Sequence, residues 1–157
     1  MSKGYIFLLI KVYVRVIGFD VIRSLGICDV LFIFGAIGMV AGSINATRAK
    51  TTRMMVAYSS VAQIGYIFAA LGLGSELGVM CALWHTLAHS ATKSMLFISA
   101  HTLDHASGDT HLRKDLRGAF YRSPLAAAAF TLGAVNLVGV PLLSVFITKV
   151  TMAQAAI

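Results

Sequence analysis

Long runs of apolar residues, each approaching the length of a membrane span, constrain the fold of this chain most strongly. They cover residues 5–19, 30–44, 54–73 and 78–100, and a last apolar stretch covers 124–157. A helix needs about 20 mostly apolar residues to cross the hydrocarbon core. Of the 157 residues, 58% are hydrophobic and 12% are charged, against about 45–50% and about 25% in an ordinary soluble domain. This composition excludes a soluble enzyme and predicts an all-α polytopic membrane helix bundle.

The last apolar stretch, 124–157, predicts one interrupted crossing. As a continuous helix it would measure about 50 Å, which exceeds the hydrocarbon thickness of about 30 Å, whereas two full crossings need about 40 residues. Pro141 follows Gly139 in its middle, and proline removes a backbone donor and clashes with the preceding turn. We therefore expect about five crossings, the last being a broken helix near Pro141.

Basic residues concentrate at the ends of the predicted spans. Under this topology one side holds eight of them: Lys3, Arg48, Lys50, Arg53, Arg113, Lys114, Arg117 and Arg122. Arg23 lies alone on the other side. Because cytoplasmic loops are enriched in Lys and Arg, the N-terminus and the loops 45–53 and 101–123 are expected to face the cytoplasm. The net charge of +7 is thereby explained without nucleic acid as a partner.

Several ionisable residues remain inside the predicted spans. They are Lys11, Arg15, His85, His89, Lys93 and Lys149. A charge near the bilayer centre costs at least about 2.5 kcal/mol, so such residues usually face protein or water and are functional. The alternatives are that Arg15 or Lys93 extends to the interface, that the histidines only join helices by hydrogen bonds, or that a histidine ligates haem. No metal or cofactor is expected, because Cys28 and Cys81 form no spaced framework.

His85, His89 and Lys93 are spaced four residues apart, which places them on one helix face about 6 Å apart. Imidazole titrates near neutrality, and a lysine that is partly desolvated also exchanges protons. This stripe therefore favours a proton relay.

Every carboxylate lies outside the predicted spans. Asp20, Asp29 and Glu76 belong to one side, and Asp104, Asp109 and Asp115 to the long loop. Because an unpaired buried charge is strongly unfavourable, either the lysines are partly neutral or another polypeptide supplies their counter-ions.

The segment from Arg53 to Tyr66, RMMVAYSSVAQIGY, resembles a signature of the proton-translocating antiporter-like subunits of respiratory complex I, Mrp Na+/H+ antiporters and membrane-bound hydrogenases. Three further segments are similar to that family in the same order. They are LIKVYVR at 9–15, the pattern HxxxHxxxKxxxF at 85–97, and GVPLLSVFITK at 139–149.

The resemblance implies roles for individual residues. Lys11 corresponds to the bridging lysine between two inverted repeats, and His85, His89 and Lys93 correspond to the central hydrophilic axis. Lys149 corresponds to the terminal ionisable residue after the break in the family's second discontinuous helix. It also implies that residues 1–157 form a partial proton-antiporter domain, whose upstream half, with a buried glutamate, is absent.

The expected function is proton translocation as part of a respiratory, hydrogenase or Mrp-type complex in the bilayer, with other membrane subunits as partners. The expected location is the bacterial inner membrane. The chain itself shows no flavin, iron–sulfur or dinucleotide motif, so an oxidoreductase label would come through its complex. The alternative is a truncated, non-transporting structural or assembly fragment.

Overall fold

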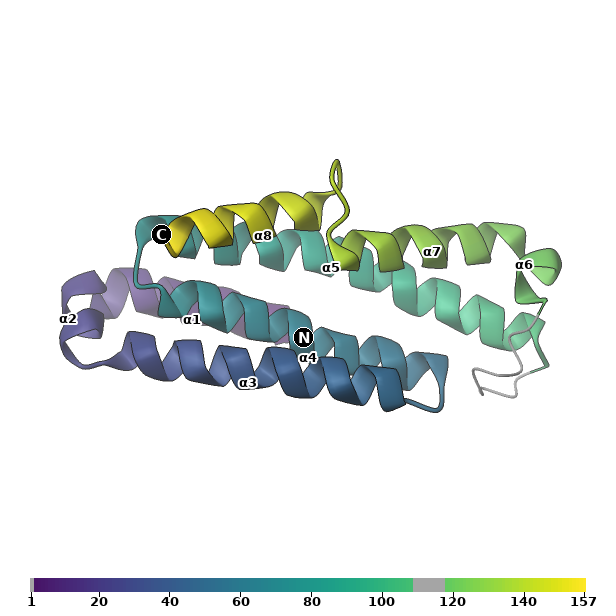
Figure 1. Ribbon diagram of the computed structural model, residues 1–157, viewed down its shortest axis with the longest axis horizontal. Helices are drawn as coiled ribbons and strands as arrows, with labels where there is room; N and C mark the ends of the chain where they lie inside the picture. Colours follow the sequence, from purple (N-terminus) through teal and green to yellow (C-terminus); the bar gives the residue numbers. More distant parts are fainter. Residues whose placement is uncertain (1, 109–117) are drawn as a thin grey trace.

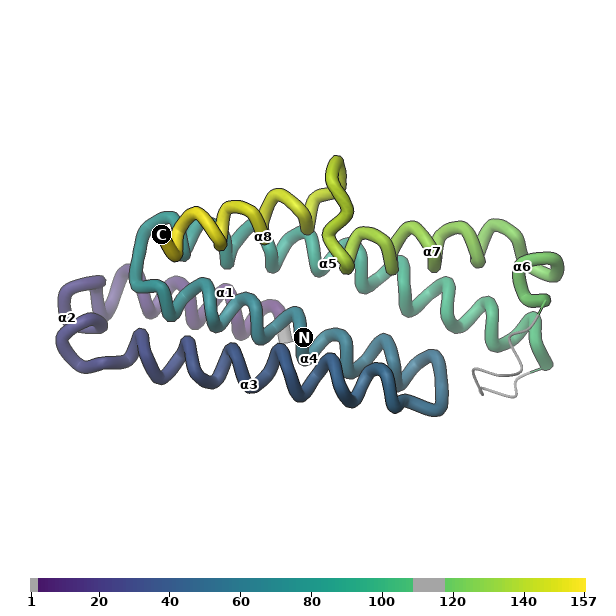
Figure 2. The backbone as a smooth tube through the Cα atoms, in the orientation of Figure 1, coloured from purple at the N-terminus to yellow at the C-terminus, as the bar shows by residue number. Residues whose placement is uncertain are grey.

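The computed structural model describes residues 2–108 and 118–157, and the elements in this part of the chain are all helices (Figure 1, Figure 2). In chain order they are α1 (Ser2–Val12), a π-helical turn η1 (Tyr13–Ile17), α2 (Phe19–Ser24), α3 (Ile27–Arg48), α4 (Thr52–Gly72), α5 (Glu76–Ala106), α6 (Ala119–Arg122), α7 (Pro124–Val138) and α8 (Ser144–Ala155). The predicted all-helical fold is confirmed. Two of these helices, α3 and α4, are long and apolar enough to cross a membrane, and α7 is a shorter apolar helix.

α3 and α4 form an antiparallel hairpin in which the two backbones lie unusually close (Figure 1). Glycines line the seam. A Cβ on Gly35 would lie 2.5 Å from the backbone nitrogen of Ala69, and a Cβ on Gly42 would lie 2.5 Å from that of Ala62. Since lipid chains are as apolar as leucine side chains, close packing of small residues is a main source of helix association in membranes.

The seam predicts that Gly42→Ala destabilises the protein, because the added methyl group meets fixed backbone atoms. Overpacking of this kind costs about 1–3 kcal/mol. Gly38→Ala is the matched control, since its Cβ would lie 3.5 Å from the Cα of Gly65, an ordinary contact. The fluorescence of Trp84 during heating of detergent-solubilised protein measures the effect. Equal melting temperatures for the two variants would contradict this account.

α5 is the longest helix and the one around which the others are arranged. It begins after Ser75, whose side chain accepts a hydrogen bond from the Gly78 amide at 3.0 Å, the preferred way to satisfy a helix start. It contacts α1, α4, α6, α7 and α8. One face is consequently buried along nearly its whole length, from Gly78 to Asp104.

The expectation of a continuous loop over 101–123 is wrong. α5 extends through Ala106, and residues 119–122 form α6. The physical reason is that Leu103 and Asp104 continue the buried face of α5, so that the helix gains packing despite the polar residues on its other side. Five charged residues that we placed in this loop lie outside the described residues: Asp109, Arg113, Lys114, Asp115 and Arg117.

The first span differs from the single helix expected over 5–19. α1 ends at Val12, a π-helical turn follows, and Gly18 then breaks the helix with a positive φ of 80° before α2 begins. The expected position of Lys3 beside the turn between α3 and α4 is also wrong, because Lys3 lines a pocket with Lys93 at the middle of α5. It does not belong to the end of the bundle where α3 meets α4. In Figure 1, α1 begins partway along the bundle and not at the turn between α3 and α4.

Arg48, Arg53 and Arg23 follow the expected distribution between two ends, whereas Arg113, Lys114 and Arg117 lie outside the described residues. Arg48 and Arg53 flank the turn between α3 and α4. At the opposite end, Arg23 donates to the Gly74 carbonyl at 2.7 Å, where α4 turns into α5. Which end faces the cytoplasm stays a prediction.

The predicted break near Pro141 is confirmed. α7 ends at Val138, Gly139 has a left-handed φ of 86°, and Leu142 has a φ of 79°. α8 begins at Ser144 and continues along α5, so the two half-helices follow one another with a projecting turn between them (Figure 1). The break frees carbonyl groups at the end of α7 and amide groups at the start of α8.

Candidate functional site

The stripe expected on one face of α5 is present and buried. His85, His89 and Lys93 are 3%, 2% and 2% exposed. The two imidazole rings are stacked, with centroids 6.3 Å apart and an interplanar angle of 17°. Three ionisable side chains thus follow one another along the interior of the helix bundle.

Lys93 is held by α4. Its Nζ donates to the Val56 carbonyl and to the Ser59 hydroxyl oxygen, both at 2.6 Å. The Ser59 hydroxyl donates its own proton to the Val56 carbonyl at 2.9 Å, so its oxygen is free to accept from the lysine. Neither acceptor is a carboxylate. The buried amine is therefore solvated by neutral oxygens of the protein.

His85 is held between α4 and α8. Its Nε2 lies 3.0 Å from the Gln63 Oε1 atom, and its Nδ1 lies 2.9 Å from the Thr148 Oγ1 atom. Both ring nitrogens are thus occupied by polar side chains. This geometry disfavours the alternative of haem ligation by His85, because a ligating histidine must turn one nitrogen toward the metal.

His89 differs from His85 in that neither ring nitrogen has a hydrogen-bond partner among the described residues. It borders a pocket of about 470 Å³, which Lys93, Lys3 and Ser60 also line. Buried polar groups are normally satisfied by protein or water, and this volume accommodates several water molecules. The pocket is therefore a hydratable space beside the two buried ionisable groups.

Lys149 belongs to α8, and its ammonium group lies at the break between α7 and α8. Its Nζ donates to the Leu137 carbonyl at 3.2 Å and to the Val138 carbonyl at 3.0 Å, and it lies 4.9 Å from the centroid of the Tyr66 ring. A cation at the carbonyl end of a helix is favoured by the helix dipole. The broken helix thus positions this lysine.

Lys11 is not brought together with the other predicted residues. Its side chain is exposed on α1, where it borders an outward groove with Arg15 of η1 and Val79 and Leu83 of α5. Among the residues that the structure describes, the buried basic row on α5 therefore consists of His85, His89 and Lys93, with the ammonium group of Lys149 close to its end.

Sequence reasoning missed two features of the site. Asp104, which we assigned to a loop, lies on the buried face of α5, with its Oδ2 3.3 Å from the Nε of Arg53. Its spacing of eleven residues after Lys93, about three helical turns, was the available signal. Asn136, before the break, donates to the Thr92 hydroxyl at 2.7 Å and to the Ser144 hydroxyl at 3.3 Å.

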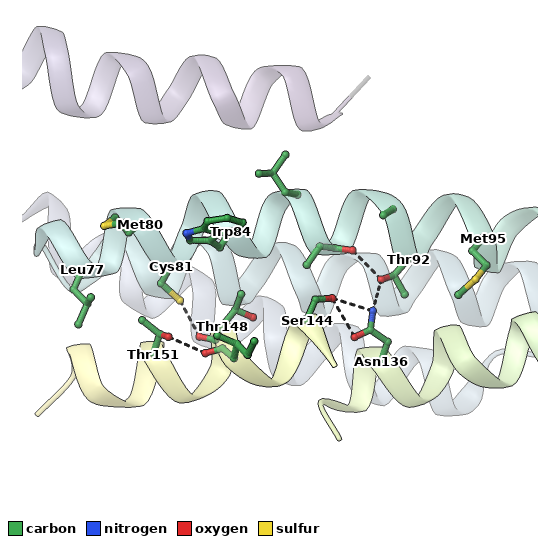
Figure 3. Close-up of a pocket in the computed structure, with 14 residues that line it drawn as sticks. Leu77, Met80, Cys81, Trp84, Thr92, Met95, Asn136, Ser144, Thr148 and Thr151 are labelled. Carbon is green, nitrogen blue, oxygen red and sulfur yellow. Dashed lines mark hydrogen bonds between the residues drawn. The ribbon is translucent and has the colours of Figure 1, made fainter. Parts of the chain in front are cut away.

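Figure 3 shows the Asn136 contacts in a second pocket, of about 760 Å³, where α5 meets the broken helix. Thr92 of α5 and Ser144 of α8 both point toward the Asn136 amide. The side-chain oxygen of Asn136 also accepts from the Val145 amide at 3.3 Å. The Asn136 side chain therefore provides an acceptor for a free backbone N–H group at the start of α8, and it joins both half-helices to α5.

A class of protein follows from these observations: an all-helical protein with apolar spans, a broken helix and a line of buried basic side chains. The sequence matches the family described as "NADH:quinone oxidoreductase/Mrp antiporter, TM" over residues 6–157. The chain belongs to this transmembrane family, whose members are subunits of complex I and Mrp antiporter type.

Three relatives illustrate the range of the family. The chain is 32% identical over 115 residues to a probable K(+)/H(+) antiporter A/B subunit of Rhizobium meliloti, covering 73% of this chain and 11% of the relative. It is 31% identical over 163 residues to a putative antiporter subunit mnhA2 of Staphylococcus saprophyticus, covering 95% and 20%. It is 37% identical over 115 residues to NADH-quinone oxidoreductase subunit N of Desulforudis audaxviator, covering 72% and 22%.

The chain thus spans between about a tenth and about a fifth of the length of these relatives. No solved structure matches the chain.

The ion pair between Arg53 and Asp104 predicts a coupling between α4 and α5. In a double-mutant cycle with Arg53→Gln and Asp104→Asn, we expect an interaction energy of about 1 kcal/mol, because one partner is buried and the other is half exposed. Unfolding of the four proteins in detergent, followed by Trp84 fluorescence, measures it. Additive effects of the two substitutions would show that the contact contributes nothing.

Proposed function

We propose that this chain contributes to proton translocation across a membrane, as part of a multisubunit complex of respiratory, hydrogenase or Mrp type. The observation that carries the proposal is the buried row of His85, His89 and Lys93 on α5, in which the lysine donates to two neutral oxygens, the Val56 carbonyl and the Ser59 hydroxyl. Intramembrane ionisable residues of this kind usually mark ion pathways.

Protons would pass along this row without covalent chemistry. A positive charge on one member repels a positive charge on the next in the low-dielectric interior, so that the protonation states of neighbours are linked. The stacked rings of His85 and His89 are 6.3 Å apart, and the pocket beside His89 and Lys93 provides space for intervening water. Lys149, at the helix break, is the proposed terminal member.

The basic residues around the pocket beside His89 indicate which partner segments the chain requires. Lys3, His89 and Lys93 line one pocket with no carboxylate among its described lining residues, so we propose that an upstream segment of such a subunit supplies a glutamate there. Lys11, exposed on α1, would face a segment of the same complex. Residues 1–157 would then form part of an antiporter domain with about five crossings in a bacterial inner membrane.

The second candidate is a structural or assembly element without transport activity. The observation that favours it is that both ring nitrogens of His85 are already engaged by side chains of neighbouring helices, Gln63 of α4 and Thr148 of α8. In that case the buried histidines and lysine would serve only as hydrogen-bonding residues between α4, α5 and α8.

Proton flux in liposomes tests the two candidates. We expect the chain, co-expressed with the preceding part of a related subunit, to dissipate an imposed pH gradient that is followed with an internal dye. Lys93→Ala should lower this flux at least tenfold, because it removes the central proton-carrying group.

Lys50→Ala is the matched control, since Lys50 is an exposed lysine in the turn between α3 and α4, and its removal should leave the flux unchanged. Unimpaired flux in Lys93→Ala would contradict the relay. No flux from the wild-type chain, alone or co-expressed, would favour the structural candidate.

A further inference from the structure

The two nitrogens of His85 are not equivalent in their surroundings. Nδ1 faces Thr148 of α8 and Nε2 faces Gln63 of α4. Among the described residues, the ionisable groups around the ring are His89, at 6.3 Å between centroids, Tyr66, at 5.8 Å, and Lys149, which lies over the Tyr66 ring. The Cys81 thiol, one helical turn before His85, bonds to the Thr148 carbonyl. Asp104, further along α5, pairs with Arg53 instead. The hydrogen bonds to Gln63 and Thr148 therefore decide which nitrogen carries a proton.

Thr148 fixes the state of Nδ1. Its hydroxyl donates its single proton to the Val145 carbonyl at 2.8 Å, within the first turns of α8. The hydroxyl oxygen can then only accept from the ring, across the distance of 2.9 Å to Nδ1. The backbone of Thr148 is also held in place, because its carbonyl accepts from the Cys81 thiol at 2.9 Å (Figure 3). Nδ1 consequently carries a hydrogen whether His85 is neutral or charged.

Gln63 can match both states of Nε2. Its side-chain amide has an acceptor oxygen and a donor NH₂ group on either side of one carbon, and a half-turn exchanges them. With the oxygen toward the ring, as in the contact at 3.0 Å, the amide accepts from a protonated Nε2. With the NH₂ group toward the ring, it donates to an unprotonated Nε2. The hydrogen bond survives the gain or loss of the proton.

We infer that Nε2 is the nitrogen through which His85 exchanges its proton, and that Gln63 is a positioning residue whose amide turns with each exchange. The step is the making or breaking of one N–H bond at Nε2 while the Gln63 amide is turned away from the ring. The proton comes from or goes to water that enters from the pocket beside His89, whose ring is stacked on that of His85. Its consequence for transport rests on the proposed function, but the assignment of the two nitrogens does not. It also implies that no proton passes from His85 to α8 through Thr148, whose proton is committed to the Val145 carbonyl.

Nitrogen-15 NMR of histidine-labelled protein in lipid bilayers tests the assignment directly. The signals of His85 are identified by their loss in His85→Gln. At a pH where the ring is neutral, we expect Nδ1 to be protonated and Nε2 to be bare, which is the reverse of the tautomer that a free histidine side chain favours. Thr148→Val removes the acceptor at Nδ1 and should convert His85 to the form protonated at Nε2, which donates to the Gln63 oxygen.

Thr151→Val is the matched control for this experiment. Its hydroxyl lies on the same helix and bonds only to the Ile147 carbonyl, at 2.8 Å, so the signals of His85 should not change. Neutral wild-type His85 protonated at Nε2, or a tautomer unaffected by Thr148→Val, would overturn the assignment.

Gln63→Met tests the role of the amide, because methionine has a similar length but offers no comparable hydrogen bond. We expect the Nε2 signal of neutral His85 to move while Nδ1 stays protonated, and proton flux to fall about tenfold. An unmoved Nε2 signal, or undiminished flux, would refute the positioning role. If even the wild-type protein shows no flux, the NMR signals still decide the inference, whereas the proposed function fails separately.

Discussion

The buried amine of Lys93 is the constraint on which the rest of the arrangement depends. An unpaired charge in the interior of a membrane protein is expensive, so the protein must surround this group with oriented oxygens. Helix α4 does so with the Val56 carbonyl and the Ser59 hydroxyl, which requires α4 to pack closely on α5. The glycine seam between α3 and α4 stabilises α4 on its other side.

The line of ionisable side chains was predictable from the sequence because it is a local property. His85, His89 and Lys93 are four residues apart on one helix, and helical geometry alone places them on one face. The break at Gly139 and Pro141 was predictable for a similar reason, since glycine and proline act on their own backbone.

The partners of these residues were not predictable in the same way. Gln63 and Thr148 reach His85 from helices that lie 22 and 63 residues away in the sequence, and no spacing rule connects them. Asp104 was misplaced because a run of polar residues indicated a loop, whereas burial of one face kept the segment helical. Lys11 illustrates the opposite limit: the resemblance to the family singles the residue out, but its side chain is exposed on α1, away from the buried row on α5.

The two lysines at the site each donate hydrogen bonds to the same number of oxygen atoms. Lys93 donates to two fixed oxygens, and so does Lys149, which satisfies the Leu137 and Val138 carbonyls. An ammonium group has three hydrogens, so in each case one is left over, and an uncharged amine has the two that the fixed oxygens require. Each lysine can therefore release a hydrogen ion without giving up either anchoring contact, and the surrounding helices need not rearrange when it does.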